Sequence, residues 1–150
     1  VLFLAKILEA KQQLTVLTSA LNVASVLCNK PMIEVIQLGG IVRKTSTSVS
    51  GPFIQPMLSQ FSCSKLFLGV DGIDLEYGCT TSNIMEANAN QYMIAAAKRT
   101  IILTDSSKFG KRGFGRICSF EQVHQIITDD KVNDKFVNTL ENMGVEVTIV

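Results

Sequence analysis

Short apolar runs rich in β-branched residues alternate along the chain with segments of helical character. The runs are continuous rather than alternating in polarity, which is typical of strands buried on both faces of a sheet. Repetition of strand, helix and strand predicts an α/β fold, with a mostly parallel sheet and helices on both faces. The predicted strands are Leu14–Thr18, Ile33–Leu38, Leu66–Val70, Thr100–Thr104, Gln125–Thr128 and Val145–Val150, and the predicted helices are Ala20–Cys28, Pro52–Phe61, Ile84–Lys98 and Asn133–Met143.

The size and charge of the chain narrow the function classes. A length of 150 residues argues for one domain with a complete core. Hydrophobic residues make up 47% and charged residues 18%, which excludes a disordered chain. The 14 basic and 13 acidic residues nearly cancel, so bulk charge offers no means of holding nucleic acid. The uncharged stretch 12–29 is too polar for a membrane span, and no segment resembles a signal peptide.

The cysteines and the single histidine argue against metal and triad chemistry. Cys28, Cys63, Cys79 and Cys118 are far apart and contain no C-x-x-C pair, which excludes a zinc ribbon or a thioredoxin motif. We expect free thiols in a reducing, cytoplasmic compartment. His124 starts a predicted strand, at the edge opposite the polar loops, and is predicted to be structural. No cofactor or metal is expected.

Small and polar residues gather where the predicted strands end. Ligands of open α/β sheets bind outside the carboxyl ends of the strands, so these residues are candidates for a binding site. The alternative is that Gly, Asp and Ser are there as turn and cap residues. The residues in question are Thr18-Ser19, Gly39-Gly40, Asp71-Gly72, Asp105–Lys108 and Asp129-Asp130.

Two stretches in the middle of the chain carry the candidate acids. Asp71 and Asp74 could accept hydrogen bonds from sugar hydroxyls or transfer protons, or they could belong to an ordinary Asp-Gly turn. Thr80 and Thr81 precede a predicted helix whose free amides favour an anion, and Glu86 could serve as a base or hydroxyl acceptor. Asn83 and Glu86 also have the spacing of a capping box.

Two loops carry the candidate cations. Asp105–Gly113 is predicted to be a flexible loop in which Lys108 lies nearest the strand end, where it could meet a phosphate. Lys111 and Arg112 have no neighbouring acid in the sequence and are predicted to be solvated. Arg43 follows Gly39-Gly40, and it could bind phosphate, tether its loop or pair across a subunit contact.

The strand-end motifs, taken in order, resemble a known family. They look like the carboxyl-terminal effector domain of the DeoR family of bacterial transcription repressors, over essentially all 150 residues. The residues Asp74–Glu76 and Thr81–Asn83 lean toward the amino-sugar repressors. The matching motifs are Val35–Gly40 with Arg43, Phe67–Gly72, Gly78–Thr81 with Glu86, Thr104–Gly110 and Ile127–Asp130.

The resemblance implies a fold similar to ribose-5-phosphate isomerase and a phosphorylated sugar as effector. It implies a winged helix-turn-helix that binds operator DNA and a phosphate loop, both before Val1, and a homo-oligomer, dimer or tetramer. Where the family usually has Thr-Asn-Ser, this chain has Thr18-Ser19-Ala20, which bears on ligand choice. The implied ligand-binding residues are Thr18, Ser19, Gly39, Gly40, Arg43, Asp71, Gly72, Thr80, Thr81, Glu86, Asp105 and Lys108.

The same resemblance raises an enzymatic alternative, a sugar-phosphate isomerase. Asp71, Asp74, Glu86 and Lys108 stand at positions like those that serve proton transfer in the isomerase family. Those enzymes also carry a lysine in the Gly-rich turn where this chain has Tyr77–Thr80. An enediolate intermediate needs preorganised positive charge, so the missing lysine favours a non-catalytic sensor.

Overall fold

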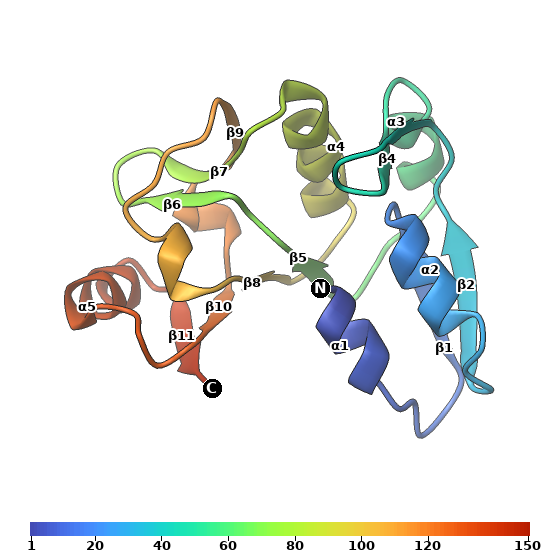
Figure 1. The fold of residues 1–150 in the computed structure, drawn as a ribbon, viewed down its shortest axis with the longest axis horizontal. Helices are drawn as coiled ribbons and strands as arrows, with labels where there is room; N and C mark the ends of the chain where they lie inside the picture. The colour runs from blue at the N-terminus through green and yellow to red at the C-terminus, as the bar shows by residue number, and fades with distance from the viewer. The chain divides into compact units, whose positions relative to one another are not determined.

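The computed structural model describes all 150 residues, and the chain divides into two compact units. Unit 1 comprises Val1–Met57 and unit 2 comprises Leu58–Val150. Figure 1 traces the chain from unit 1, in blue to green, into unit 2, in green to red.

Unit 1 is built on one parallel strand pair with its crossover helix. Strand β1 (Leu14–Thr18) pairs with β2 (Ile33–Gln37), so that Leu14 lies opposite Ile33 and Thr18 opposite Gln37. Helix α2 (Leu21–Leu27) connects them, and a small core forms where α1 (Leu2–Ile7) packs on α2. The hairpin of β3 (Ile41–Arg43) and β4 (Ser48–Ser50) and the short helix α3 (Ile54–Leu58) follow. The buried residues of this core are Ala5, Val23, Leu27 and Ile33.

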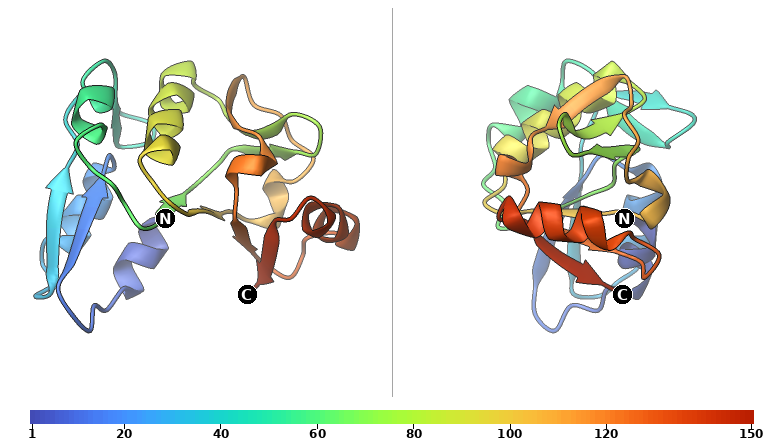
Figure 2. Two further views of the ribbon diagram at one scale, coloured as in Figure 1. Left: turned by 180° about the vertical axis from the view of Figure 1, so that it is seen from behind. Right: turned by 90° about the vertical axis from the view of Figure 1, so that its left-hand side faces the viewer.

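Unit 2 contains a four-stranded parallel sheet in the order β11-β10-β8-β5. Its central strands carry the core: Ile102 of β8 and Ile126 of β10 are fully buried. Helix α5 packs beside β11, and α4 packs beside β5, β7 and β9 (Figures 1 and 2). The bounds are β5 Leu66–Leu68, β8 Thr100–Leu103, β10 Gln125–Thr128, β11 Glu146–Ile149, α4 Ile84–Ala95 and α5 Asp134–Asn142.

A three-stranded antiparallel sheet in the order β6-β7-β9 accompanies the parallel one in unit 2. Strands β6 (Gly72–Asp74) and β7 (Gly78–Thr81) form a hairpin, and β9 (Gly115–Cys118) pairs with β7. Two short 3₁₀ helices, η1 (Ser106–Lys108) and η2 (Phe120–Gln122), follow β8 and β9. The hairpin positions the candidate site, because it begins directly after Asp71.

The predicted α/β class and the order of the predicted elements are confirmed. The predicted strands pair in parallel within each unit, helices flank the parallel sheet, and five of the six predicted strands begin at the predicted residue. The predicted helix Ile84–Lys98 ends earlier, because Cys63 N donates to Ala96 O and Lys98 N donates to Cys63 O. The likeness to ribose-5-phosphate isomerase remains a prediction.

Three expectations need correction. Strand β1 is exposed in its first half rather than buried on both faces. Gly78–Thr81 is a strand that the sequence did not predict, although the helix expected after it does begin at Ile84. The loop predicted over Asp105–Gly113 begins with η1 and leads into strand β9 of the antiparallel sheet. The strands of that sheet are too short and too polar to be recognised in the sequence.

Candidate functional site

Asp71 is the centre of a hydrogen-bonded cluster in unit 2. Its Oδ2 accepts from the Thr81 hydroxyl at 2.9 Å and from the Ser82 backbone N–H at 2.8 Å. Asp71 N in turn donates to Thr80 O at 2.9 Å. The hairpin register, in which Gly72 lies opposite Thr80, brings these residues together from ten positions apart. The Asp71 side of this cluster stays exposed to solvent, so it is open to a ligand.

Thr81 stands between two carboxylates. Its Oγ1 lies 2.9 Å from Asp71 Oδ2 and 3.4 Å from Glu86 Oε2. A hydroxyl has one hydrogen to donate, so the shorter contact with Asp71 takes the greater share of it. Thr81 is buried, and its hydroxyl contacts both acids. Glu86 is only partly buried.

The start of α4 places Glu86. Asn83 is the N-cap, and its Oδ1 accepts from Met85 N at 2.9 Å and from Glu86 N at 3.1 Å. This satisfies two backbone donors that a helix start leaves without helical partners. The asparagine half of the predicted capping box is thus confirmed. Glu86 lies in the first turn, where its negative charge also suits the helix dipole.

Lys108 supplies positive charge within electrostatic reach of Asp71. Burial alone would raise the pKa of Asp71, but hydrogen bonds from Ser82 and Thr81, together with the charge of Lys108, hold that pKa below its ordinary value. Lys108 acts on Asp105 in the same direction. It therefore lies within electrostatic reach of both aspartates, at the end of η1.

Two aspartates fix the turn that carries Lys108. Asp105 Oδ1 accepts from Ser107 N at 3.0 Å, and Asp129 Oδ2 accepts from Ser106 N at 2.7 Å. The Ser107 hydrogen bonds to Asp105 and the Ser106 hydrogen bonds to Asp129 lower the pKa of each carboxyl. Both acids thus act as turn-forming residues that orient Lys108, and Asp129 was singled out in the sequence only as a strand-end residue.

Thr80 and Gly72 hold the backbone under the cluster. Thr80 is fully buried, its Oγ1 donates to Gly72 O at 3.2 Å, and the same oxygen accepts from Gly113 N at 2.8 Å. A Cβ on Gly72 would lie 2.4 Å from Lys111 O. Both were predicted to bind ligand, but the Thr80 hydroxyl is occupied within the fold, which assigns it to supporting the site.

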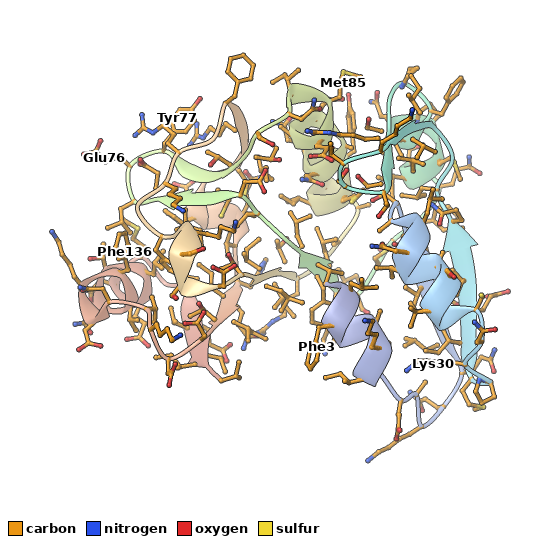
Figure 3. All side chains as sticks on the ribbon, in the orientation of Figure 1. Phe3, Lys30, Glu76, Tyr77, Met85 and Phe136 are labelled. Carbon is orange, nitrogen blue, oxygen red and sulfur yellow. The ribbon has the colours of Figure 1, made fainter.

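Arg112 has an acidic partner, contrary to expectation. Its Nε and Nη2 donate to Asp74 at 3.0 and 2.9 Å, and they lower the pKa of Asp74 to about 2. The Arg112 guanidinium also lies 4.6 Å from the centre of the Tyr77 ring, in the turn between β6 and β7 (Figure 3). Asp74 is therefore engaged in an ion pair. Arg112 is exposed to solvent, as predicted, but nothing in the sequence indicated its partner, which is 38 residues away in the chain.

The remaining candidate residues lie in unit 1, around the ends of β1 and β2. Thr18 Oγ1 accepts from Ala20 N at 3.1 Å, Ser19 O accepts from Val49 N at 2.8 Å, and Gly39 N donates to Met57 Sδ at 3.4 Å. These contacts join the end of β1 to β4 and the end of β2 to α3.

The other two unit 1 candidates flank β3. At Gly40 a Cβ would lie 2.5 Å from Ser50 O, so only glycine fits. Arg43 Nε donates to Thr45 Oγ1 at 2.8 Å, a contact that tethers its own loop. The structure thus groups Thr18, Ser19, Gly39, Gly40 and Arg43 in one unit, and Asp71, Thr81, Glu86 and Lys108 in the other. That these residues bind one ligand together remains a prediction.

Two further sequence expectations concern His124 and metal binding. His124 Nδ1 accepts from Thr100 N at 3.1 Å at the start of β10, so its predicted structural role is confirmed. No three His, Cys, Asp or Glu side chains gather in positions that could hold a metal ion. The longest helix, α4, has 12 residues, and none of the helices has the length and apolar character needed to cross a bilayer.

Sequence reasoning missed the Ser82 amide, which donates to Asp71. Backbone donors leave no mark in residue type, so only the hairpin register reveals this one. The site as a whole presents two carboxylates, a buried hydroxyl and a lysine. Carboxylates accept hydrogen bonds from hydroxyl groups, and a lysine attracts an anion. Such a set suits a small polyhydroxylated anion.

Comparison with known proteins shows the family of this chain. The family model described as the DeoR C terminal sensor domain matches residues 1–130, and so spans both units. The HTH-type transcriptional regulator YulB of Bacillus subtilis (strain 168) is 38% identical over 148 residues, covering 99% of this chain and 57% of the relative. The HTH-type transcriptional repressor GlcR of the same organism is 33% identical, covering 90% and 52%.

A third relative is the Lactose phosphotransferase system repressor of Staphylococcus epidermidis (strain ATCC 35984), 31% identical, covering 81% of this chain and 49% of the relative. The matching family model and these relatives define the class of the chain, a sensor domain of transcriptional regulators. The chain belongs to the DeoR family, in the part described as the C terminal sensor domain. It spans about half the length of the curated relatives it matches.

Proposed function

We propose that this chain senses a phosphorylated sugar and thereby controls the DNA binding of a repressor of sugar metabolism. The observation that carries the proposal is the cluster of Asp71, Thr81 and Glu86 with Lys108 beside it. The two carboxylates would accept hydrogen bonds from sugar hydroxyls, and Lys108 would attract the phosphate or another anionic group. The name of one relative, a lactose phosphotransferase system repressor, supports a sugar-linked effector.

The rest of the proposed protein lies outside this chain. A winged helix-turn-helix before Val1 would bind operator DNA, and a dimer or tetramer in the cytoplasm would place two such modules on paired half-sites. The effector controls DNA binding only if it prefers one arrangement of that oligomer. Moving a population from 1:99 to 99:1 takes a preference of about 5.5 kcal/mol summed over the sites.

We propose a sensor rather than an isomerase. An enediolate intermediate would need positive charge held around it. The β6–β7 turn, where the isomerases carry a lysine, has Tyr77 and Gly78, and Tyr77 is covered by Arg112, whose guanidinium is already paired with Asp74. The amino-sugar phosphates are the first candidates, because Asp74–Glu76 and Thr81–Asn83 resemble those of the amino-sugar repressors.

Isothermal titration of the whole protein, as its gene encodes it, tests the proposal against a panel of sugar phosphates and the corresponding unphosphorylated sugars. We expect at least one sugar phosphate to bind, and Glu86→Gln and Lys108→Met each to weaken it at least tenfold. Lys111→Met is the matched control, because Lys111 is exposed three residues further along the same loop. Binding that is unaffected by both variants would place the effector elsewhere.

The isomerase alternative is tested in the same samples by NMR. Aldose–ketose exchange that is catalysed by the wild-type protein and abolished by Glu86→Gln would favour an enzyme. Binding without exchange would favour the sensor.

A further inference from the structure

Two buried cysteines face each other across the β7–β9 ladder. Cys79 is fully buried, Cys118 is 3% exposed, and the two are directly opposite in the antiparallel register. Opposite residues of such a ladder have Cα atoms about 4.5 to 5.5 Å apart, within the range of about 4.4 to 6.8 Å that a disulfide spans. Closing a disulfide here therefore needs no rearrangement of the strands.

A β-bulge aims Cys118 at Cys79. Cys79 lies opposite Cys118 and Thr80 lies opposite Arg116, so Ile117 is an extra residue on β9. Successive side chains of a regular strand point to opposite faces, yet Ile117 and Cys118 are both buried. The bulge turns both inward, so that Cys118 lies opposite Cys79 within the buried core of unit 2.

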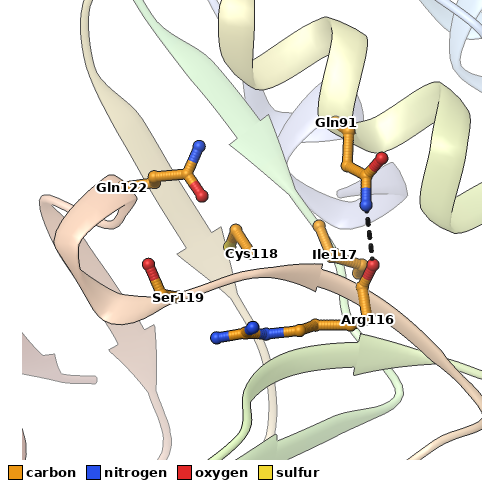
Figure 4. A pocket seen from close by; sticks show the side chains of 6 residues that line it. All are labelled: Gln91, Arg116, Ile117, Cys118, Ser119 and Gln122. Carbon is orange, nitrogen blue, oxygen red and sulfur yellow. Dashed lines mark hydrogen bonds between the residues drawn. The ribbon is translucent and has the colours of Figure 1, made fainter.

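A hollow on the surface leads to Cys118. It measures about 300 Å³ and is lined by residues of α4, β9 and η2, with Arg116 among them (Figure 4). Gln91 Nε2 donates to Arg116 O at 3.0 Å and closes one side. None of the residues of the proposed sugar-phosphate site lines this hollow. The lining residues are Gln91, Arg116, Ile117, Cys118, Ser119 and Gln122.

The two thiols differ in their readiness to lose a proton. The hydrogen bond with Cys79 lowers the pKa of Cys118 against the effect of burial, and the charge of Arg116 lowers it further. The same hydrogen bond, together with burial, raises the pKa of Cys79. Cys118 lines the hollow and Cys79 does not, so Cys118 is the attacking sulfur and Cys79 is the sulfur that completes the bond.

We propose that Cys79 and Cys118 form an oxidative modification site, in which a small hydroperoxide that enters the hollow beside Arg116 converts the dithiol to an intramolecular disulfide. With hydrogen peroxide as the hydroperoxide, the Cys118 thiol first releases its proton and the thiolate attacks one peroxide oxygen. An S–O bond forms, the O–O bond breaks, and the leaving hydroxide takes up the released proton as water. The Cys79 sulfur then attacks the Cys118 sulfenic acid, an S–S bond forms, the S–O bond breaks, and hydroxide leaves with the Cys79 proton as a second water. The two sulfurs are oxidised by two electrons in total, and the peroxide is reduced by two.

This modification does not depend on the proposed sensing of a sugar phosphate, and its test uses no sugar. The reduced chain is treated with hydrogen peroxide, its remaining thiols are alkylated, and its peptides are analysed by mass spectrometry. We expect a peptide pair joined through Cys79 and Cys118. The control is the double variant Cys28→Ser/Cys63→Ser, which keeps the pair and removes the two more exposed thiols. It should form the same linkage.

Two results would overturn the proposal. One is full alkylation of Cys79 and Cys118 at peroxide concentrations that oxidise Cys28. The other is stepwise oxidation of Cys118 to a sulfinic acid while Cys79 stays reduced. Neither result requires a core variant to fold, because both are measured on the wild-type chain and on the Cys28→Ser/Cys63→Ser variant.

A separate variant tests whether the oxidant enters through the hollow beside Arg116. Arg116 is exposed, so Arg116→Gln leaves the core intact, and we expect linkage formation to slow several-fold. Lys111→Gln, which removes an exposed charge from the preceding loop, should leave the rate unchanged. Equal rates in wild type and Arg116→Gln would contradict the role given to Arg116.

Discussion

The Thr81 hydroxyl donates to Asp71 Oδ2 at 2.9 Å, although ten residues separate the two in sequence. This contact joins the end of a parallel strand to the last residue of the β6–β7 hairpin. It also sets one carboxylate beside the first turn of α4, where Glu86 lies 3.4 Å from the same hydroxyl. One buried threonine therefore contacts both carboxylates of the proposed site.

Thr81→Val keeps the shape of the side chain and removes the hydroxyl. The lost hydrogen bond to a charged partner should lower the free energy of unfolding by about 1 to 2 kcal/mol. Urea denaturation measures the change. Thr139→Val is the matched control, because the Thr139 hydroxyl donates only to the carbonyl of Lys135 on an exposed helix face. An equal effect of the two substitutions would contradict the special place of Thr81.

Gly72→Ala should destabilise the chain strongly. The added Cβ would lie 2.4 Å from Lys111 O and 2.7 Å from Thr80 Oγ1, so the backbone of the hairpin would have to shift. Overpacking of this kind costs about 2 to 3 kcal/mol. Gly39→Ala provides the comparison, since its nearest new contact is Met57 Sδ at 3.9 Å. Thermal unfolding should show a large fall in Tm for Gly72→Ala and little change for Gly39→Ala.

Asn83→Ala should weaken the start of α4. Two backbone donors would lose the side chain that caps them, which costs about 1 kcal/mol. Because the cap also positions Glu86, the same variant should weaken effector binding. Asn138→Ala, in the exposed middle of α5, should be neutral or slightly stabilising. Denaturation curves for the two variants that coincide would refute the assignment of Asn83 as a cap.

Acid should weaken the chain partly through Asp74. Its pKa falls from 3.8 to about 2 in the folded state, where Arg112 and the Tyr77 amide bind the charged form. A depressed folded pKa stabilises the fold above the unfolded value, and this contribution disappears as the pH falls from about 4 to about 2. Asp71, whose pKa is also lowered, contributes with the same sign.

In Asp74→Asn the decline in Tm over that pH range should be shallower than in wild type, while Asp130→Asn, a control at a strand end, should leave it unchanged. A wild-type slope retained by Asp74→Asn would mean that the ion pair with Arg112 does not contribute to acid stability.

The strands of the parallel sheet could be predicted because their core positions lie in recognisable apolar runs of the sequence. Ile102 and Ile126 sit in runs without polar interruption, and both are fully buried. The antiparallel strands β6, β7 and β9 could not be predicted, because they are three or four residues long and contain glycine, threonine and arginine. Their pairing is determined by tertiary contacts rather than by local preference.

The candidate site was predictable to a similar extent. Asp71 and Lys108 follow from the rule that ligands bind beyond strand ends, and Thr81 and Glu86 follow from the polar stretch before a predicted helix. The burial of Thr80, the Ser82 amide and the pairing of Arg112 with Asp74 depend on the hairpin register, and that register cannot be deduced from residue spacing alone.

The most direct test of the account is calorimetric titration of the whole protein with its tightest-binding sugar phosphate, comparing wild type with Asp71→Asn. Asp71 is exposed and holds the centre of the cluster, so its substitution should leave the fold in place and reduce affinity at least tenfold. An affinity for the sugar phosphate that is the same in both proteins would contradict the site proposed for this sensor domain.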